Sequence, residues 1–189
     1  MLKRSVEPLT PEEYFRLEAD SPVRLEYVAG QVYAMTGASI RHNLIAGSLY
    51  AALRRHLRAS PCRVFMEGVK LHLARDNAYY YPDVMVSCDP RLEKLSADDK
   101  IVDQPCVLIE VLSESTAGID RREKMLAYRR LASLKEYVLV EQDVRHVEVF
   151  RRVGDVGWEQ VILEAGDTLV LPSLEFSLSL DEIYEGTGI

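Results

Sequence analysis

The chain has 189 residues and a formal net charge of −7, and 48% of its residues are hydrophobic and 28% charged. This composition is typical of a folded globular protein and excludes an intrinsically disordered chain. No apolar run approaches the ~18 residues that span a bilayer, so we expect no membrane segment, and at about 150 residues per domain the length predicts one domain.

The first predicted elements are a short helix and a β-hairpin. Thr10 and Glu13 form a capping-box pattern with proline at the first helical position, which predicts a helix to about Glu18. The segments RLEYV and QVYAM flank the pair Ala29 and Gly30, and they predict two strands joined by a tight turn.

A long helix is predicted next, from an N-cap at Ser39 to about Ala59. Its apolar residues recur at helical spacing along one face: Ile45, Leu49, Leu53 and Leu57. We therefore expect this face to pack on a sheet.

The rest of the chain alternates strand-like and helical patterns. Strands are predicted at about 63–73, 82–88, 106–112, 137–141 and 147–152, followed by short strands and a final helical turn near Asp181. Asp120 and Glu123 form a second capping-box pattern, which predicts a helix from Asp120 to about Ala132. The order helix, three strands, helix, strand predicts an α/β (α+β) domain with a mixed sheet.

The three cysteines are Cys62, Cys88 and Cys106, which are widely spaced and form no CxxC pair. Their number and spacing argue against a disulfide framework and against a zinc site. With no apolar stretch of a secretory signal at the N-terminus, they predict a reducing, cytoplasmic compartment.

The negative charge is concentrated at the C-terminal end, where residues 140–189 hold 11 acidic and 3 basic residues. No acidic residue lies between Glu26 and Glu67, and a second basic stretch surrounds Asp120 and Glu123. These two stretches either bind a polyanion or form solvated helix faces. Their candidate contacts to a nucleic-acid backbone are Arg41, Arg54, Arg58, Arg121 and Arg122.

Two carboxylates fall where strands are predicted. Asp83 follows Pro82 at the start of a strand, and Glu110 lies inside the apolar run CVLIEVL. A carboxylate in a central strand is costly unless a cation or a metal pairs with it, and carboxylates on neighbouring strands are typical ligands of magnesium. The alternatives are a turn-forming role for Asp83 and an ion pair with an arginine for Glu110.

Lys124 shares one face of the predicted helix with Tyr128 and Leu131. If this face packs on the sheet, the amine of Lys124 points toward the carboxylates, where it can position a phosphate or a water. The alternative is an exposed lysine at the edge of the core. Asp120 is interpreted as the cap of this helix.

His42 and Glu26 are supporting candidates. His42 lies on the inward face of the long helix near its N-terminus, where it either contacts a phosphate or is a hydrogen-bonded core histidine. Glu26 lies on a predicted strand and either adds a metal contact or pairs with Arg24 or a basic helix face. The remaining histidines show no ligand spacing, which disfavours zinc.

In this order of elements and motifs, the chain resembles the PD-(D/E)xK nucleases and, within them, the Uma-type family of restriction endonucleases. The likeness runs from about Leu9 to Ile183. It rests on RLEYVAGQVYAM, the helix with His42, YPDVMVSC, CVLIEVLSEST, DRREKMLAYRRLASLKEYVLVE and PSLEFSLSLDEIY.

The resemblance implies a restriction-endonuclease-like αβββαβ core at about 38–141, an N-terminal helix and hairpin at 10–36 and a C-terminal β extension at 145–185. It implies that Asp83 and Glu110 bind the metal. The lysine that such nucleases carry two residues after the glutamate is Leu112 here, and Lys124 is its expected replacement. The matching positions of Glu26 and His42 imply supporting roles.

The function predicted from this resemblance is magnesium- or manganese-dependent hydrolysis of phosphodiester bonds in DNA by a homodimer. One alternative is an inactive nuclease-like fold that serves as a nucleic-acid-binding or protein-interaction module. Leu112 and the acidic C-terminal region favour this alternative. Another is hydrolysis of a small phosphodiester, which requires a pocket too narrow for a duplex.

Overall fold

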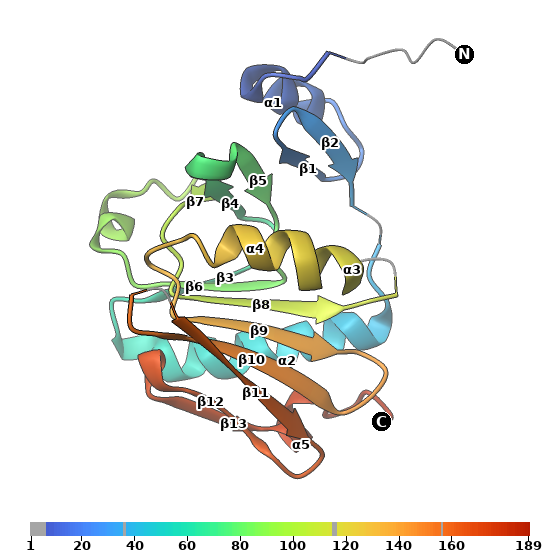
Figure 1. The fold of residues 1–189 in the computed structure, drawn as a ribbon, viewed down its shortest axis with the longest axis vertical. Coiled ribbons are helices and arrows are strands. Elements are labelled where there is room, and N and C mark those ends of the chain that lie inside the picture. Colours follow the sequence, from blue (N-terminus) through green and yellow to red (C-terminus); the bar gives the residue numbers. More distant parts are fainter. Residues whose placement is uncertain (1–6, 36, 115–116, 156) are drawn as a thin grey trace.

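The computed structural model describes residues 7–35, 37–114, 117–155 and 157–189. This part of the chain forms a six-stranded sheet in the order β11-β10-β9-β8-β6-β3, a five-stranded sheet in the order β2-β1-β5-β4-β7, and the hairpin β12-β13 (Figure 1). The strands are β1 Leu25–Val28, β2 Gln31–Ala34, β3 Arg63–Met66, β4 Lys70–Leu73, β5 Ala78–Tyr80, β6 Val84–Ser87, β7 Ile101–Val102, β8 Val107–Leu112, β9 Glu136–Glu141, β10 His146–Val153, β11 Gly157–Glu164, β12 Thr168–Leu171 and β13 Phe176–Ser179.

The N-terminal elements agree with the sequence-based prediction. Helix α1 (Pro11–Ala19) begins at Thr10 with both hydrogen bonds of the capping box. Ala29 and Gly30 join β1 to β2 with φ values of 48° and 94°, which is the left-handed geometry that a two-residue hairpin turn requires. Gly30 is also needed for space, because a Cβ there would lie 2.4 Å from Cβ of Pro8.

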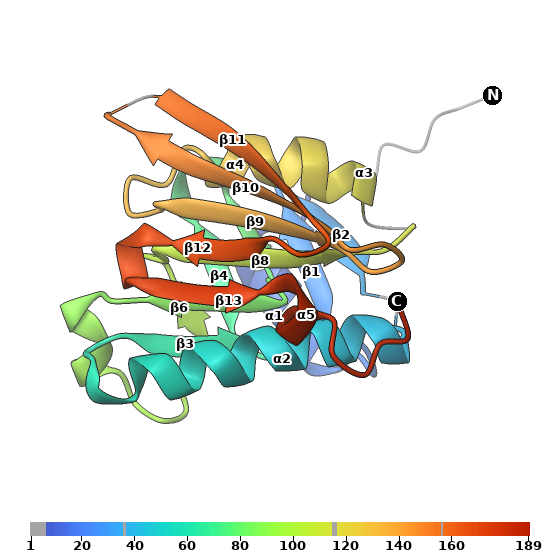
Figure 2. The same cartoon turned by 90° about the horizontal axis from the view of Figure 1, so that it is seen from below.

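The six-stranded sheet has helical segments on both of its faces (Figures 1 and 2). Helix α2 (Ile40–His56), the hairpin β12-β13 and α5 (Leu180–Ile183) cover one face. A continuous helical segment, residues 117–128, covers the other face and connects β8 to β9, which are parallel neighbours. Such a crossover between parallel strands fits the mixed sheet that the order of elements predicted.

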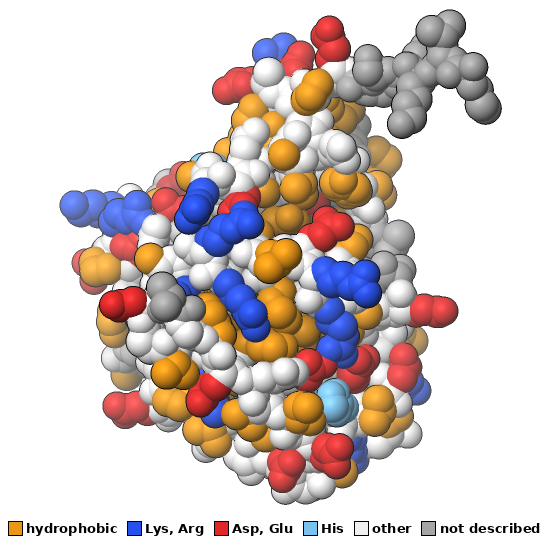
Figure 3. All heavy atoms as spheres, viewed as in Figure 1, with side chains coloured by type: hydrophobic (Ala, Val, Ile, Leu, Met, Phe, Trp, Pro, Cys, Tyr) orange, Lys and Arg blue, Asp and Glu red, His pale blue; other side chains and the backbone are white. Residues whose placement is uncertain are grey.

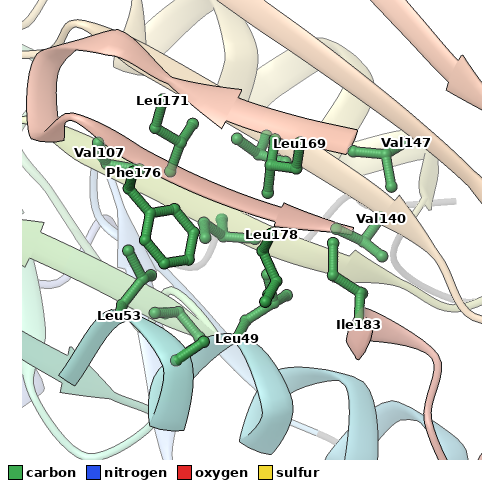
Figure 4. Close-up of a cluster of buried hydrophobic side chains, with 14 of the residues drawn as sticks. Leu49, Leu53, Val107, Val140, Val147, Leu169, Leu171, Phe176, Leu178 and Ile183 are labelled. Atoms are coloured by element: carbon green, nitrogen blue, oxygen red, sulfur yellow. The ribbon is translucent and has the colours of Figure 1, made fainter. Parts of the chain in front are cut away.

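The larger core lies between α2, the sheet and the C-terminal hairpin (Figure 4). The predicted apolar face of α2 is confirmed, because Ile45, Leu49 and Leu53 are fully buried there. Strand β8 is buried on both faces, as expected for a central strand. Val107, Ile109 and Val111 point into this core, while Leu108 and Leu112 join the second core beneath residues 117–128.

The single strand predicted at 63–73 is two strands in different sheets. Glu67 has φ 40° and breaks the extended chain between β3, which pairs with β6, and β4, which pairs with β5. A non-glycine residue with positive φ gives no signal in a pattern of apolar residues, and the short strands β5 and β7 were missed as well.

The helix predicted from Asp120 to Ala132 begins earlier and ends earlier. Its parts are α3 (Ala117–Ile119), a π-helical stretch (Asp120–Lys124) and α4 (Met125–Tyr128). The prediction that Asp120 caps this helix is wrong, since Asp120 lies inside the helix and is 2% exposed. Its carboxylate pairs with Lys124 instead.

The expectation that the cysteines form no disulfide is also wrong. Arg63 pairs with Ser87 at the ends of β3 and β6, which places Cys62 opposite Cys88, and the two form a disulfide. Their separation of 26 residues hid a contact that the strand register creates. Cys106, at the start of β8, has its Sγ 3.7 Å from that of Cys88.

This disulfide is expected to stabilise the fold. For a loop of 26 residues, the chain-entropy relation gives about 3.5 kcal/mol, because the cross-link restricts the unfolded chain. Cys62→Ser should therefore lower the free energy of unfolding by about that amount in urea titrations without reductant. Cys106→Ser is the control, and a Cys62→Ser variant as stable as wild type would contradict the prediction.

A buried ion pair fastens α1 to the rest of the molecule. Lys70 Nζ lies 2.5 Å from Glu18 Oε2, and the hydroxyl of Tyr81 donates to Glu18 Oε1 at 2.6 Å. Burial alone would raise the pKa of Glu18, but hydrogen bonds from Lys70 and Tyr81 lower it below its ordinary value.

A depressed pKa in the folded state means that Glu18 contributes stability above its ordinary pKa and loses it as pH falls through the folded value. Wild type should therefore be more stable than Glu18→Gln at pH 7, and the difference should shrink below about pH 4. Unfolding at several pH values measures this. Glu12→Gln, on the exposed side of the same helix, is the control for the loss of a carboxylate that lacks the Lys70 and Tyr81 contacts.

Candidate active site

Strand register brings the two predicted carboxylates together. Val84 of β6 pairs with Ile109 of β8, so Asp83 lies opposite Glu110. The amide of Val111 donates to Asp83 Oδ2 at 2.7 Å, and the amide of Asp83 donates a longer bond to Glu110 Oε2 at 3.4 Å.

Lys124 lies beside this pair, in the orientation that its helix face predicted. Its side chain is almost fully buried, and its Nζ lies 3.2 Å from Glu110 Oε1, 3.1 Å from Asp120 Oδ1 and 3.5 Å from Glu26 Oε1. Leu112, in the place of the expected lysine, is buried in the apolar core beneath the helix. The amine therefore reaches Glu110 from the helix and not from β8.

His42 reaches the same site from the first turn of α2. Ser39 caps this helix, and His42 Nε2 lies 3.2 Å from Asp83 Oδ2. Burial lowers the pKa of His42, but the hydrogen bond and charge of Asp83 outweigh it, and the net pKa is raised above the ordinary value. The imidazole thus holds the Asp83 carboxylate in place.

The site carries more negative than positive charge. Among the described residues, the carboxylates of Glu26, Glu110 and Asp120 contact the ammonium group of Lys124, and Asp83 lies beside Glu110. Burial raises the pKa of Glu110 well above its ordinary value; Lys124 opposes this rise, and the neighbouring carboxylates add to it. Burial alone would lower the pKa of Lys124, but these carboxylates raise it well above its ordinary value, so Lys124 stays charged.

A cavity of about 990 Å³ gives access to these groups. Its lining includes Glu26, His42, Asp83, Glu110, Asp120 and Lys124, together with residues of the N-terminal hairpin. Among the described residues, no group of three or more His, Cys, Asp or Glu side chains is arranged to hold a metal ion. The donor set therefore offers the two carboxylates Asp83 and Glu110 to a cation.

No role in the site was predicted from the sequence for two residues that contact it, Tyr128 and Asp120. The buried hydroxyl of Tyr128 donates to Glu110 Oε1 at 2.9 Å, the same oxygen that Lys124 contacts. Its position four residues after Lys124 is the signal for it, because residues at that spacing share a helix face. Asp120 was noticed but assigned to a cap.

The five arginines proposed as backbone contacts do not line the cavity. Arg41 pairs with Asp143 at 2.6 Å, and Arg121 pairs with Glu141 and Glu148. Arg54 lies twelve residues after His42 on α2, which places it about 18 Å along the helix axis, and Arg58 lies beyond it. Arg122 is exposed.

On the face seen in Figure 3, Lys and Arg side chains form a band over residues 117–128, and Asp and Glu prevail over the C-terminal strands. This separation of charge matches the distribution along the sequence. It is compatible with either interpretation of the basic stretches, a polyanion contact or a solvated helix face.

Comparisons with known proteins show the family and the fold of this chain. Residues 11–181 match the model of the family Uma2, which is described as "Putative restriction endonuclease". The chain belongs to the Uma2 family. Two Synechocystis sp. proteins are similar to this Uma2 member: slr1290 is 34% identical over 94% of this chain and 92% of its own length, and sll1609 is 32% identical over 84% and 89%.

A solved structure shows the same fold as this Uma2 member. It is the crystal structure of a protein of Anabaena variabilis described as a "putative nuclease belonging to DUF820". The two chains superpose with a TM-score of 0.79 over 95% of this chain and 99% of the other, at 18% identity. The restriction-endonuclease-like fold predicted from the sequence is therefore confirmed. No helix in the described part of the chain is long and apolar enough to cross a membrane.

Replacing Glu110 should stabilise this Uma2 member at neutral pH. Because the pKa of Glu110 is raised in the folded state, its ionisation costs stability as pH rises above the ordinary value. Glu110→Gln should therefore be more stable than wild type at pH 7 without divalent metal, and the difference should vanish near pH 4.

Chemical unfolding in EDTA at both pH values measures this difference, with the exposed Glu93→Gln as a control. A variant less stable than wild type at pH 7 would show that Lys124 outweighs the burial of Glu110.

Proposed function

We propose that this Uma2 member is a divalent-metal-dependent endonuclease that hydrolyses phosphodiester bonds in DNA. The observation that carries the proposal is the amine of Lys124, 3.2 Å from Glu110 and on the cavity that also exposes Asp83. A lysine beside two carboxylates is the set of groups that the resemblance assigned to the active site, and here a helix supplies the lysine that β8 lacks.

The residues present fit a magnesium or manganese ion. Magnesium is typically held by one or two carboxylates, with waters and phosphate oxygens completing its shell, and Asp83 and Glu110 offer this set. The fit also rests on charge, because the carboxylates of Glu26, Asp83, Glu110 and Asp120 outnumber the ammonium group of Lys124, which contacts three of them. Such an ion, when bound, supplies an activated water and offsets the charge that develops on the phosphate.

The chain's own residues divide the remaining work. Lys124, which stays charged, holds a non-bridging phosphate oxygen or the attacking water close to Glu110. Glu26 and Asp120 fix the amine from two other sides, at 3.5 and 3.1 Å. His42 orients Asp83 through its contact with Oδ2. The Tyr128 hydroxyl donates to Glu110 Oε1, so the other carboxylate oxygen of Glu110, Oε2, lies toward Asp83.

It stays a prediction that Arg54, Arg58 and Arg122 contact the nucleic-acid backbone. Arg41 and Arg121 can make such contacts only if their ion pairs open. The homodimer and the cytoplasmic location stay predictions as well. Contacts of arginine with phosphates position a nucleic acid without selecting its sequence, and they weaken steeply with salt.

The nuclease proposal is tested by incubating supercoiled plasmid with purified protein and magnesium or manganese. Wild type should nick the plasmid, EDTA should abolish nicking, and Asp83→Ala and Lys124→Ala should each lose about 10²-fold or more in rate. Arg91→Ala is the matched surface control, since Arg91 pairs with Asp89 and Asp103 outside the cavity.

An inert wild type with either metal would contradict the proposal and leave the binding-module alternative. Variants that cut as fast as wild type would show that the activity belongs to a contaminant or to another site.

A further inference from the structure

Arg24, the first residue of RLEYVAGQVYAM, lines the wall of the active-site cavity. Among the described residues that form this lining, the lysine and arginine side chains are those of Lys124 and Arg24. Lys124 is buried and engaged by three carboxylates, whereas the side chain of Arg24 is 47% exposed. An incoming anion can therefore bind Arg24 without breaking the buried ion pairs that hold Lys124.

The backbone of Arg24 is fixed while its guanidinium is held loosely. The carbonyl of Arg24 accepts a 2.9 Å hydrogen bond from the amide of Met35, which continues the hairpin ladder. The guanidinium lies over the ring of Tyr81 at 5.8 Å, and its Nη1 is 3.7 Å from Glu67 Oε2. The distance between Nη1 and Oε2 is too long for a hydrogen bond, so the two side chains attract each other only through their charges.

A structural role explains this contact poorly. An ion pair between half-exposed side chains contributes about 0–1 kcal/mol, which is little reason to hold an arginine in a cavity. Glu67 also adopts φ 40°, a strained conformation for glutamate, and this turn places its carboxylate in the cavity lining. Arg24 and Glu67 therefore line the cavity that Asp83 also lines, and their contact does not lie in the apolar core.

The charge of the cavity gives Arg24 a function. Six carboxylates line it, those of Glu26, Glu67, Asp83, Glu110, Glu114 and Asp120. A phosphodiester entering the cavity meets this negative potential, and a guanidinium is the group best suited to bind a phosphate through paired N–H donors.

We propose that Arg24 binds a backbone phosphate next to the scissile bond, and that Glu67 competes with that phosphate for the guanidinium. This assignment rests on the proposed nuclease function. In the free protein Arg24 stays near Glu67 and over Tyr81. When nucleic acid enters, the guanidinium exchanges the distant carboxylate for the phosphate, while the Tyr81 ring limits how far it moves. Glu67 thereby weakens the binding of substrates that place a phosphate at this position, because the phosphate must displace it from the guanidinium.

The test compares Arg24→Ala, Glu67→Gln and the double variant in magnesium-dependent cleavage of a fluorescein-labelled DNA duplex. Arg24→Ala should raise KM about 10-fold with kcat changed less than about 3-fold, because a ground-state phosphate contact is lost. Glu67→Gln should lower KM about 3-fold, since it frees the guanidinium. In the Arg24→Ala background, Glu67→Gln should lower KM much less than it does in wild type, because the guanidinium for which Glu67 competes is absent there.

Arg91→Ala, an exposed ion-paired arginine outside the cavity, is the control and should leave KM and kcat unchanged. Melting temperatures within about 2 °C of wild type would show that the variants are folded. Binding of the same duplex, measured by fluorescence anisotropy in calcium, should change in parallel with KM.

The outcomes separate this assignment from the nuclease proposal. If wild type cleaves and Arg24→Ala keeps the wild-type KM, the assignment of Arg24 is overturned and the nuclease proposal stands. If Glu67→Gln raises KM, Glu67 orients Arg24 and does not compete, which overturns the exchange. If wild type cleaves no nucleic acid, the nuclease proposal fails, and the assignment falls with it.

Discussion

The ammonium group of Lys124 is the contact on which the arrangement of the site depends. Removing charged groups from water costs several kcal/mol for each, and this cost is met only when opposite charges are close and well placed. Lys124 offsets part of this cost for carboxylates on three separate elements, namely Glu26 on β1, Glu110 on β8 and Asp120 on its own helix. The N-terminal hairpin, the central strand and the crossover helix are thereby held at one point.

The two sheets meet around this point, and a second buried pair secures the same junction. Glu18 and Lys70 fix α1 to β4, and Tyr81, which donates to Glu18, directly precedes Pro82 and Asp83. The start of β6 is therefore supported from the side of the N-terminal helix and from the side of β8. Groups placed on strands and packed helices in this way keep their geometry better than groups on loops.

Much of the fold follows from local patterns. The capping box at Thr10, the turn at Ala29 and Gly30 and the apolar face of α2 each have a local cause, and each prediction was confirmed. The features that were missed depend on contacts between segments distant in sequence. The disulfide between Cys62 and Cys88 follows from strand register, and the division of residues 63–73 follows from a positive φ at Glu67.

The candidate site shows the same limit. The inward direction of Lys124 was predictable because it shares a helix face with Tyr128, and the meeting of Asp83 with Glu110 was predictable because both were assigned to strands. The role of Asp120 was not, because a capping box and a buried ion pair use the same residue types. Nor was the placement of Arg24, since the partner Glu67 lies in a turn that no sequence pattern indicates.

The position of the lysine on a helix changes what controls the site. On a strand, a lysine two residues after a glutamate is held beside it by the pleat of one continuous backbone. Here the distance between the two groups is set by how residues 117–128 dock on the sheet, including the π-helical stretch that carries both Asp120 and Lys124. Small apolar substitutions under this helix, far from any charged group, can therefore move the amine relative to Glu110. Natural variation in that apolar layer provides a route for tuning the site without changing any of its polar residues.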